Sequence, residues 1–198
     1  SDFTFSGNTL TSNTINGVYL GTNVAANTIN TNQTWPFIGA DTSYVVDVPL
    51  IIVDSGAVLT VEPGVVVKFD PAFGSVLDIA NGSLQSVGTN SLPISFTSLG
   101  DDSRGGDTNG AGAAAARGDW KGVLINLVSS ADFAHTTLAY GSKDNAGTIN
   151  NGGLVSMDWS RVTEGSGPNV IATGGTTTIT NSEIDNADHG IEHQGGSL

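Results

Sequence analysis

Apolar and polar residues alternate in short runs along most of the chain. Residues 57–62 place Leu59 and Val61 on one face of an extended segment, and the turn pair Pro63-Gly64 follows them. Similar alternating runs, each bounded by turn residues, cover residues 65–69, 77–79 and 94–97. A period of two, interrupted by Gly, Asn, Asp or Pro, is typical of half-buried strands. The pattern therefore predicts an all-β chain of many short strands.

The strands follow one another at a spacing that indicates a repeat. Leu59-Thr60-Val61 is matched in character by Leu77-Asp78-Ile79, and residues 138–140 and 179–184 continue the pattern less regularly. Short strands recurring about every 20–25 residues are typical of a solenoid in which each coil stacks on the next. We expect a right-handed parallel β-helix. A β-sandwich, which has similar strands at longer spacing, is the alternative.

The chain divides into two parts on this interpretation. Residues 1–44 are rich in Asn and Thr and are expected to form an N-terminal cap or extra coils. Residues 45–198 are expected to form the coils of the β-helix, interrupted by a long Gly- and Asp-rich loop at residues 100–119. Loops of this length are uncommon in compact domains unless they have a function or lack order.

Several segments resemble a known group of proteins. These segments are AVLTVEPGVVVKF (57–69), SVLDIANGSLQSVGT (75–89), PISFTS (93–98), GDWKGVLI (118–125), TTLAYG (136–141) and TITNSEIDNADHGI (178–191). They are similar to bacterial secreted and cell-surface proteins with right-handed parallel β-helix repeats, the architecture of the pectate-lyase-like superfamily. The resemblance implies a fold. It does not imply one activity, because lyases, glycosidases and adhesins share this architecture, and function has to be argued from a site.

Composition and charge exclude several classes of protein. Six Lys and Arg residues stand against 19 Asp and Glu residues, and the net charge is −13. Nucleic acid is therefore not an expected partner, because phosphate binding needs clustered Lys and Arg. The absence of Cys excludes disulfides and Cys-ligated metals. No apolar run approaches the roughly 18 residues of a transmembrane helix. Few charges, many Thr, Asn and Gly residues and a start at Ser1 rather than Met predict a processed, secreted or cell-surface protein.

Two segments carry residues that are common metal ligands. Asp101, Asp102, Asp107 and Asn109 are candidates for calcium, because hard cations prefer several oxygen ligands on a flexible loop. A solvated acidic loop is the alternative. The sequence from His189 to His193 fits the H-x-x-E-H zinc pattern, which requires a helix. Its Gly-rich neighbourhood predicts a strand and turn instead, so we expect no zinc there.

Paired carboxylates could hydrolyse a glycosidic bond if two of them project from neighbouring coils. The candidate pairs are Asp158 with Glu164, and Glu183 with Asp185 or Asp188. An ordinary solvent-facing strand would show the same alternation. A lyase would need a basic residue to abstract a proton, but the Lys and Arg residues are isolated from one another in the sequence.

Exposed aromatic rings could bind sugars through their faces. Trp35 and Trp159 are the candidate ligand-binding residues, and Trp35 is expected to be exposed because Pro36 follows it in a polar segment. Trp120, inside the GDWKG segment, is interpreted as structural.

Taken together, these patterns predict an extracellular or cell-surface β-helix module with a structural, adhesive or carbohydrate-binding role. Its expected partners are polysaccharide or neighbouring copies of itself. The chain stops inside a predicted coil with no polar cap. We therefore expect either that the natural protein continues beyond Leu198 or that another protein surface covers the open coil end, as in assembly with neighbouring copies. The alternative is a polysaccharide-degrading hydrolase or lyase.

Overall fold

The fold is all-β over the residues that the structure, a computed structural model, describes: 10, 12–13, 15–21, 27–110 and 112–195. The strands form three parallel sheets, which are called the first, second and third sheet below. A single short 3₁₀ helix, η1 (Lys143–Asn145), lies between strands in this described part of the chain.

The bounds of the strands, in spatial order within each sheet, are as follows. The first sheet contains β1 (Gly17–Leu20), β4 (Ser43–Val46), β7 (Val66–Phe69), β10 (Ile94–Ser98), β13 (Thr136–Ala139), β16 (Arg161–Thr163) and β19 (Glu183–Ile184). The second sheet contains β2 (Asn27–Ile29), β5 (Leu50–Val53), β8 (Val76–Ile79), β11 (Gly122–Ile125), β14 (Ile149–Asn151), β17 (Val170–Ala172) and β20 (Ile191–His193). The third sheet contains β3 (Gln33–Trp35), β6 (Val58–Val61), β9 (Ser83–Val87), β12 (Ser130–Ala134), β15 (Leu154–Asp158) and β18 (Thr176–Thr180).

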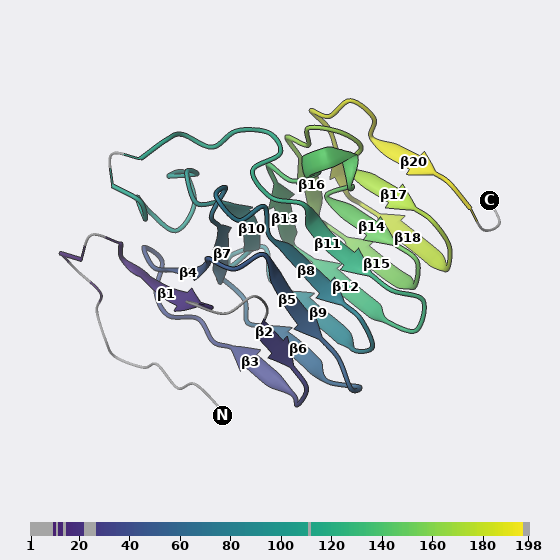
Figure 1. Cartoon of the computed structure of the whole chain (residues 1–198), viewed down its shortest axis with the longest axis horizontal. Coiled ribbons are helices and arrows are strands. Elements are labelled where there is room, and N and C mark those ends of the chain that lie inside the picture. The colour runs from purple at the N-terminus through teal and green to yellow at the C-terminus, as the bar shows by residue number, and fades with distance from the viewer. Residues whose placement is uncertain (1–9, 11, 14, 22–26, 111, 196–198) are drawn as a thin grey trace.

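Consecutive strands belong to different sheets, and each strand pairs in parallel with the strand three places further along the chain (Figure 1). The chain therefore winds as a solenoid, and the predicted parallel β-helix is confirmed. The alternative β-sandwich is wrong, because its sheets would be antiparallel. None of the helices in the described residues is long and apolar enough to cross a membrane.

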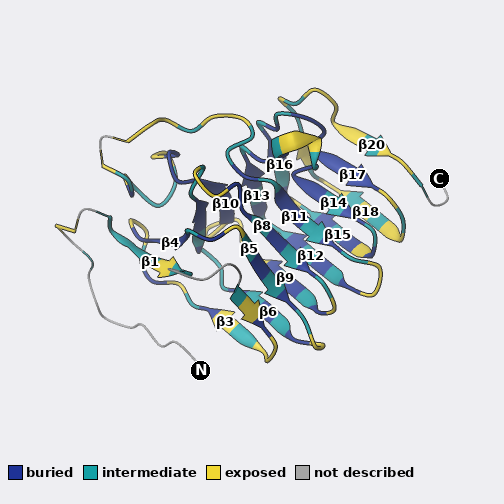
Figure 2. Ribbon diagram, viewed as in Figure 1, coloured by how far each residue is buried: buried dark blue, intermediate teal, exposed yellow. Residues whose placement is uncertain are grey.

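The core is built from columns of inward-facing side chains that stack from coil to coil. In the third sheet Leu84, Ala131 and Val155 are in register, and each is at most 1% exposed. Figure 2 shows buried positions alternating with positions of intermediate burial along the strands of this sheet. Leu59 is in register with Leu84 in the same sheet, whereas Leu77 belongs to the second sheet. The similarity between residues 59–61 and 77–79 therefore reflects two faces of the solenoid rather than equivalent places in successive coils.

The N-terminal segment contributes strands to all three sheets. β1 pairs with β4, β2 with β5 and β3 with β6. β1, β2 and β3 thus belong to the first coil that the structure describes. The stretch Asn13-Thr14-Ile15-Asn16, which recurs as Asn27-Thr28-Ile29-Asn30, lies partly outside the described residues.

The long segment between β10 and β11 packs on the outer face of the first sheet. Lys68, which points outward from β7, is fully buried beneath it and donates a hydrogen bond from Nζ to the carbonyl of Gly106 at 2.6 Å. Arg104 donates to the hydroxyl of Ser95 on β10 at 3.0 Å. At its end, buried Trp120 stacks on Phe69 with ring centroids 3.9 Å apart, so the interpretation of Trp120 as structural is confirmed.

Candidate functional site

Single left-handed residues turn the corner between the third and the first sheet. His135, Trp159 and Asn181 follow β12, β15 and β18, with φ angles of +44°, +48° and +49°. The residues before them, Ala134, Asp158 and Thr180, are in register, so the three turns stack coil on coil. Non-glycine residues are uncommon in this backbone region. A strained conformation that recurs in three successive coils fixes the direction in which these side chains leave the backbone.

A column of hydroxyl groups holds this corner together. The hydroxyl of Ser160 accepts a hydrogen bond from the backbone N–H of Thr136 at 3.1 Å. One coil further on, the hydroxyl of Ser182 accepts from the backbone N–H of Ser160, also at 3.1 Å. The corner interrupts the ladder of sheet hydrogen bonds, and buried amides left without a partner are costly. The side-chain hydroxyls therefore replace the missing backbone acceptors.

The stacked turns and the loop after β9 line an open groove of about 460 Å³. Apart from Pro93 and Trp159, the residues that line the groove are polar. The lining consists of Thr89, Asn90, Pro93, His135, Thr136, Thr137, Trp159, Ser160, Arg161, Asn181, Ser182 and Glu183.

Trp159 is the one large aromatic side chain in the groove lining. It is 61% exposed, and its ring is parallel to that of His135 in the preceding coil, with centroids 6.4 Å apart and an interplanar angle of 11°. The flat face of an indole packs well against the C–H face of a sugar ring, and its N–H remains available to a polar partner. The sequence-based prediction that Trp159 presents an aromatic surface is consistent with this geometry.

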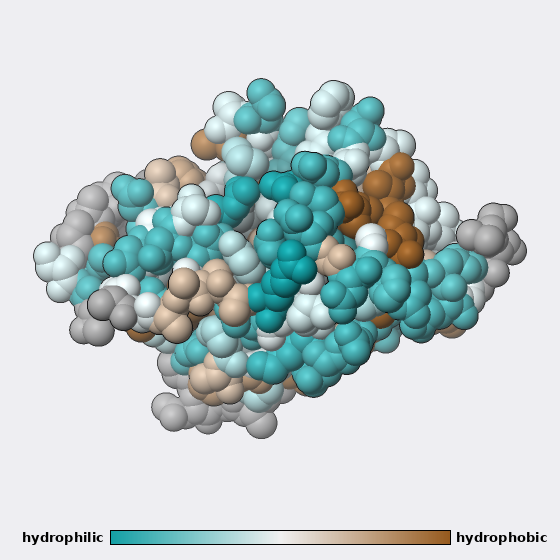
Figure 3. Space-filling model, turned by 90° about the horizontal axis from the view of Figure 1, so that it is seen from above, coloured by the Kyte–Doolittle hydropathy of each residue, from teal (hydrophilic) through white to brown (hydrophobic). Residues whose placement is uncertain are grey.

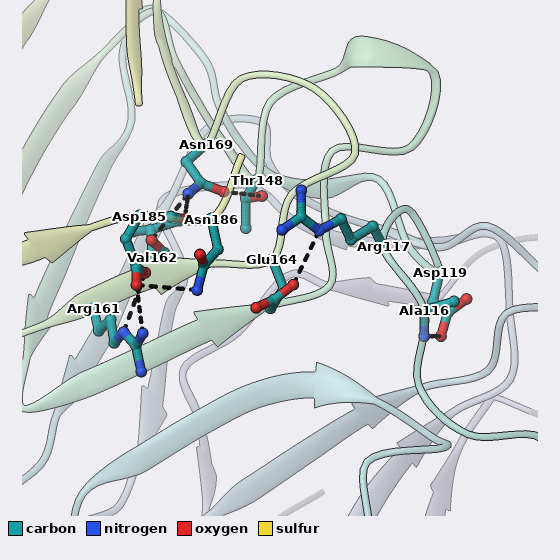
Figure 4. Close-up of polar contacts among 10 residues, drawn as sticks. All are labelled: Ala116, Arg117, Asp119, Thr148, Arg161, Val162, Glu164, Asn169, Asp185 and Asn186. Carbon is teal, nitrogen blue, oxygen red and sulfur yellow. Dashed lines mark hydrogen bonds and ion pairs between the residues drawn. The ribbon is translucent and has the colours of Figure 1, made fainter. Parts of the chain in front are cut away.

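Arg161 provides the charged part of the groove. Its guanidinium group makes two contacts with Asp185, at 3.2 and 2.5 Å (Figure 4). It makes a third contact with Glu183 at 3.2 Å. Buried Asn169 donates to the carbonyls of Val162 and Asp185 at 3.0 and 2.6 Å, which fixes the backbone that carries this carboxylate. The hydrogen bond from Arg161 holds the pKa of Asp185 below its usual range. Asp185 therefore stays ionised.

Asp158 stands beside the groove rather than in its lining. Its carboxylate accepts hydrogen bonds at 2.8 Å from Asn181 Nδ2 and from the hydroxyl of Thr180. The bond from Asn181 and the bond from Thr180, in that order, lower the pKa of Asp158. This carboxylate is also ionised at neutral pH, and it anchors the amide of Asn181 at the groove wall.

The structure separates the proposed carboxylate pair Asp158 and Glu164. Asp158 lies on the outer face of the third sheet, whereas Glu164 follows β16 and pairs with Arg117 at 3.0 Å (Figure 4). Glu183 and Asp185 do lie together, because both contact Arg161. The hydrogen bond from this guanidinium group stabilises the ionised form of Asp185.

The expected exposure of Trp35 is wrong. Its side chain points inward from β3, in register with Val61, and is only 6% exposed. It stacks on Tyr44 with centroids 5.7 Å apart, and the Tyr44 hydroxyl donates to the carbonyl of Pro36 at 2.9 Å. The residues around Trp35 are polar because they face outward or turn the chain, while the indole itself fills the core. The indole therefore presents no broad exposed face, and its contact with open space is limited to a small cavity of about 160 Å³ that it lines with Ile29 and Ile51.

The acidic loop residues surround a lysine. Asp101 is buried and accepts hydrogen bonds from the Thr97 hydroxyl at 2.6 Å and from the backbone and hydroxyl of Ser103 at 3.1 and 2.5 Å. Burial lowers the pKa of Lys68, and the charges of Asp101, Asp102 and Asp107 oppose that effect. Asn109 donates to the carbonyl of Ala113 at 3.3 Å. Calcium binding at Asp101, Asp102, Asp107 and Asn109 stays a prediction, which the buried ammonium group disfavours.

Across the described residues, no group of three or more His, Asp or Glu side chains is placed to hold a metal ion. The His189–His193 segment contains β20, a strand, as its Gly-rich neighbourhood predicted. Two imidazoles four residues apart in an extended chain lie too far from each other to share one zinc ion.

No known protein family, curated protein or solved structure matches this chain. The parallel β-helix is shown by the strand pairing, while the likeness to bacterial surface proteins remains a resemblance of sequence.

Sequence reasoning missed His135, Arg161 and Asn181 as parts of one site. They come from three coils, and no local motif contains more than one of them. Alignment of the residues that follow each strand of the third sheet would have placed His135, Trp159 and Asn181 in one column.

Proposed function

We propose that the groove at the corner of the third and first sheets binds carbohydrate, with Trp159 as the stacking surface. The observation that carries this proposal is the 61% exposure of a tryptophan held in a strained turn at the edge of a polar hollow. An exposed indole contributes no burial free energy to folding, and keeping so large an apolar surface in water is unfavourable. The same placement suits an apolar sugar face.

The polar lining supports the choice of a neutral sugar. Hydroxyls of Thr and Ser and the amides of Asn90 and Asn181 both donate and accept hydrogen bonds, as sugar hydroxyls do. Arg161 already contacts two carboxylates, so its positive charge is balanced within the protein. The net charge of −13 also disfavours a polyanion at this groove.

Binding fits this groove better than hydrolysis does. A glycosidase needs one carboxyl group with a raised pKa to protonate the leaving oxygen. The pKa values of Asp158 and Asp185 are lowered, the first mainly by Asn181 and the second by Arg161. Neither group lines the groove, and neither has the raised pKa that a general acid needs. We therefore propose a binding module of the extracellular space or cell surface.

Glycan-array screening of the wild-type chain, Trp159→Ala and Leu127→Ala tests this proposal. Leu127 is 81% exposed and does not line the groove, so its variant controls for loss of an exposed apolar side chain. We expect the wild type and Leu127→Ala to bind the same neutral glycans and Trp159→Ala to lose them. Equal binding by all three proteins, or a failure of the wild type to bind any neutral glycan, would overturn the proposal.

The last described coil supports a second candidate role, assembly with another copy. Within the described residues β18, β19 and β20 each pair on one side only. Ile191 is 55% exposed although it continues the column of buried Ile149 and Val170, and Figure 3 shows apolar surface toward this end. An unpaired strand edge beside apolar side chains favours the addition of further strands, either from a continuation of the chain or from another copy. We expect light scattering to show concentration-dependent oligomers that Ile191→Lys abolishes, and a wild type that stays monomeric would contradict assembly.

A further inference from the structure

Three lysines occur in the whole chain, and two of them line a single hollow. This hollow of about 330 Å³ lies at the corner between the first and second sheets, away from the carbohydrate groove. It is lined by Pro49, Ala72, Phe73, Gly74, Val76, Lys121, Lys143 and Asp144. In the sequence Lys121 and Lys143 are isolated basic residues. The solenoid brings them together because the segments before β11 and β14 stack on each other.

The backbone holds both lysines firmly. The N–H of Lys121 donates to the carbonyl of Ser75 at 2.9 Å, and the N–H of Lys143 donates to the carbonyl of Trp120 at 3.0 Å. Trp120 is fully buried against Phe69 and donates from Nε1 to the carbonyl of Ala139 at 2.8 Å. The two ammonium groups thus extend from a rigid part of the core into a shallow surface hollow.

Gly74 lets the Lys143 side chain lie across the neighbouring turn. Its φ is +55°, and a Cβ atom at this position would come within 3.2 Å of Lys143 Cδ. Lys143 Nζ donates one long hydrogen bond, at 3.4 Å, to the carbonyl of Pro71. An ammonium group has three donors, so Lys143 keeps donors for a ligand.

The charge in the hollow is only partly balanced. Asp144 is the one carboxylate in its lining and lies 3.6 Å from Lys121 Nζ, with the two side chains 70% and 44% exposed. An exposed ion pair of this kind contributes little free energy and yields readily to a ligand. The hollow therefore presents a net positive charge in a protein with a net charge of −13.

Part of the lining of the hollow is apolar. Phe73 is 43% exposed and lies with Pro49, Ala72 and Val76 in the lining. A bare inorganic anion would use the ammonium groups and leave this surface in water. A carboxylate attached to a six-membered ring would use both, with the ring on Phe73 and the carboxylate between the lysines.

We propose that this hollow binds a small ring-bearing carboxylate, through Lys121, Lys143 and Phe73. The binding is independent of the carbohydrate groove, because the two sites share no residue. Two probes with the same carboxylate group, D-glucuronate and benzoate, distinguish a sugar ring from an aromatic ring.

NMR titration of the ¹⁵N-labelled chain is the test. We expect saturable shifts of the amide signals of Phe73, Gly74, Lys121 and Lys143 with one or both probes, and none with D-glucose. The variant Lys121→Gln/Lys143→Gln should weaken binding by about tenfold or more, the effect of roughly one lost charge-assisted contact. Phe73→Ser should weaken binding of the ring-bearing probe and leave any weak binding of inorganic sulfate unchanged.

Arg117→Gln is the matched control, because it removes one positive charge from an exposed ion pair outside the hollow. It should bind the probe like the wild type. The proposal is overturned if neither carboxylate shifts these signals at millimolar concentration, if D-glucose shifts them equally, or if the double lysine variant binds as tightly as Arg117→Gln. Thermal unfolding of each variant shows that a loss of binding is not a loss of fold.

Discussion

The rings of His135 and Trp159 lie parallel on adjacent coils, with their centroids 6.4 Å apart. Both residues turn the same corner in a left-handed backbone conformation, so their spacing follows from the stacking of the coils. The solenoid thus builds an aromatic and polar surface from residues that are far apart in the sequence. Substitutions in the core, in the turns and in the long loop test the packing of this scaffold separately from ligand binding at its surface.

Trp120→Ala should be among the most damaging substitutions in the chain. The indole is fully buried, stacks on Phe69 and donates to the carbonyl of Ala139. Loss of a buried aromatic side chain of this size costs about 3–5 kcal/mol. Urea unfolding measures the change, and Leu127→Ala, which truncates a side chain that is 81% exposed, should change the free energy of unfolding little. Similar effects for the two variants would contradict the position of Trp120 in the core.

Gly175→Ala and Gly56→Ala should differ sharply, although both glycines have positive φ angles, +62° and +75°. A Cβ at Gly175 would overlap the carbonyl oxygen of Gly153 in the neighbouring coil, whereas a Cβ at Gly56 meets nothing within 4 Å. Gly56→Ala should cost about 1–2 kcal/mol for the left-handed backbone alone. Gly175→Ala should cost clearly more, because the two coils must move apart. Equal melting temperatures for the two variants would show that the coils do not stack as described.

Lys68→Met tests how the long loop is held on the first sheet. The methionine fills similar space but leaves the carbonyl of Gly106 with only the longer hydrogen bond from the Thr108 hydroxyl, at 3.4 Å, a loss worth about 1–3 kcal/mol. We expect reduced stability toward urea and faster proteolytic cleavage within residues 102–118. An unchanged cleavage rate would mean that the loop is anchored by its other contacts, including the bond from Arg104 to Ser95.

Arg161→Gln should alter the pH dependence of stability. Arg161 lowers the pKa of Asp185, so the stability contributed by this pair is present above the ordinary aspartate value of about 3.9. It is lost as the pH falls through the lowered pKa of folded Asp185. Both side chains are partly exposed, so the difference from wild type at neutral pH should be about 1 kcal/mol or less.

Urea unfolding across the acid range measures this difference, which should shrink as the pH falls. Arg117→Gln, which breaks the exposed pair with Glu164, is the control and should have a smaller effect at every pH. A difference between Arg161→Gln and wild type that grew toward low pH would contradict the assigned role of Arg161.

Much of the scaffold could be predicted from the sequence, because strand alternation and turn residues are local signals. The inward positions of Leu59 and Val61 follow from alternation alone. The equivalence of residues 59–61 with 77–79 did not hold, because the three faces of a solenoid have similar alternation and the sequence does not mark which face a strand belongs to.

The sites were less accessible to sequence reasoning. Trp35 lies in a polar segment but points inward, because successive side chains of a strand point to opposite faces and Trp35 is in register with buried Val61. In the sequence Lys121 and Lys143 are isolated charges, and only the stacking of the coils brings them into one hollow. In both cases the missing information is the register between coils, which is set by packing of the whole core.

The most direct test of the proposed function is the indole N–H signal of Trp159 in NMR spectra recorded with and without a bound neutral oligosaccharide from the glycan array. Trp35 and Trp120 are buried, so their indole signals serve as internal references. If the groove binds carbohydrate, the Trp159 signal shifts saturably while the Trp120 signal stays in place. Binding that leaves the Trp159 signal unmoved would contradict the assignment of the groove as the carbohydrate site.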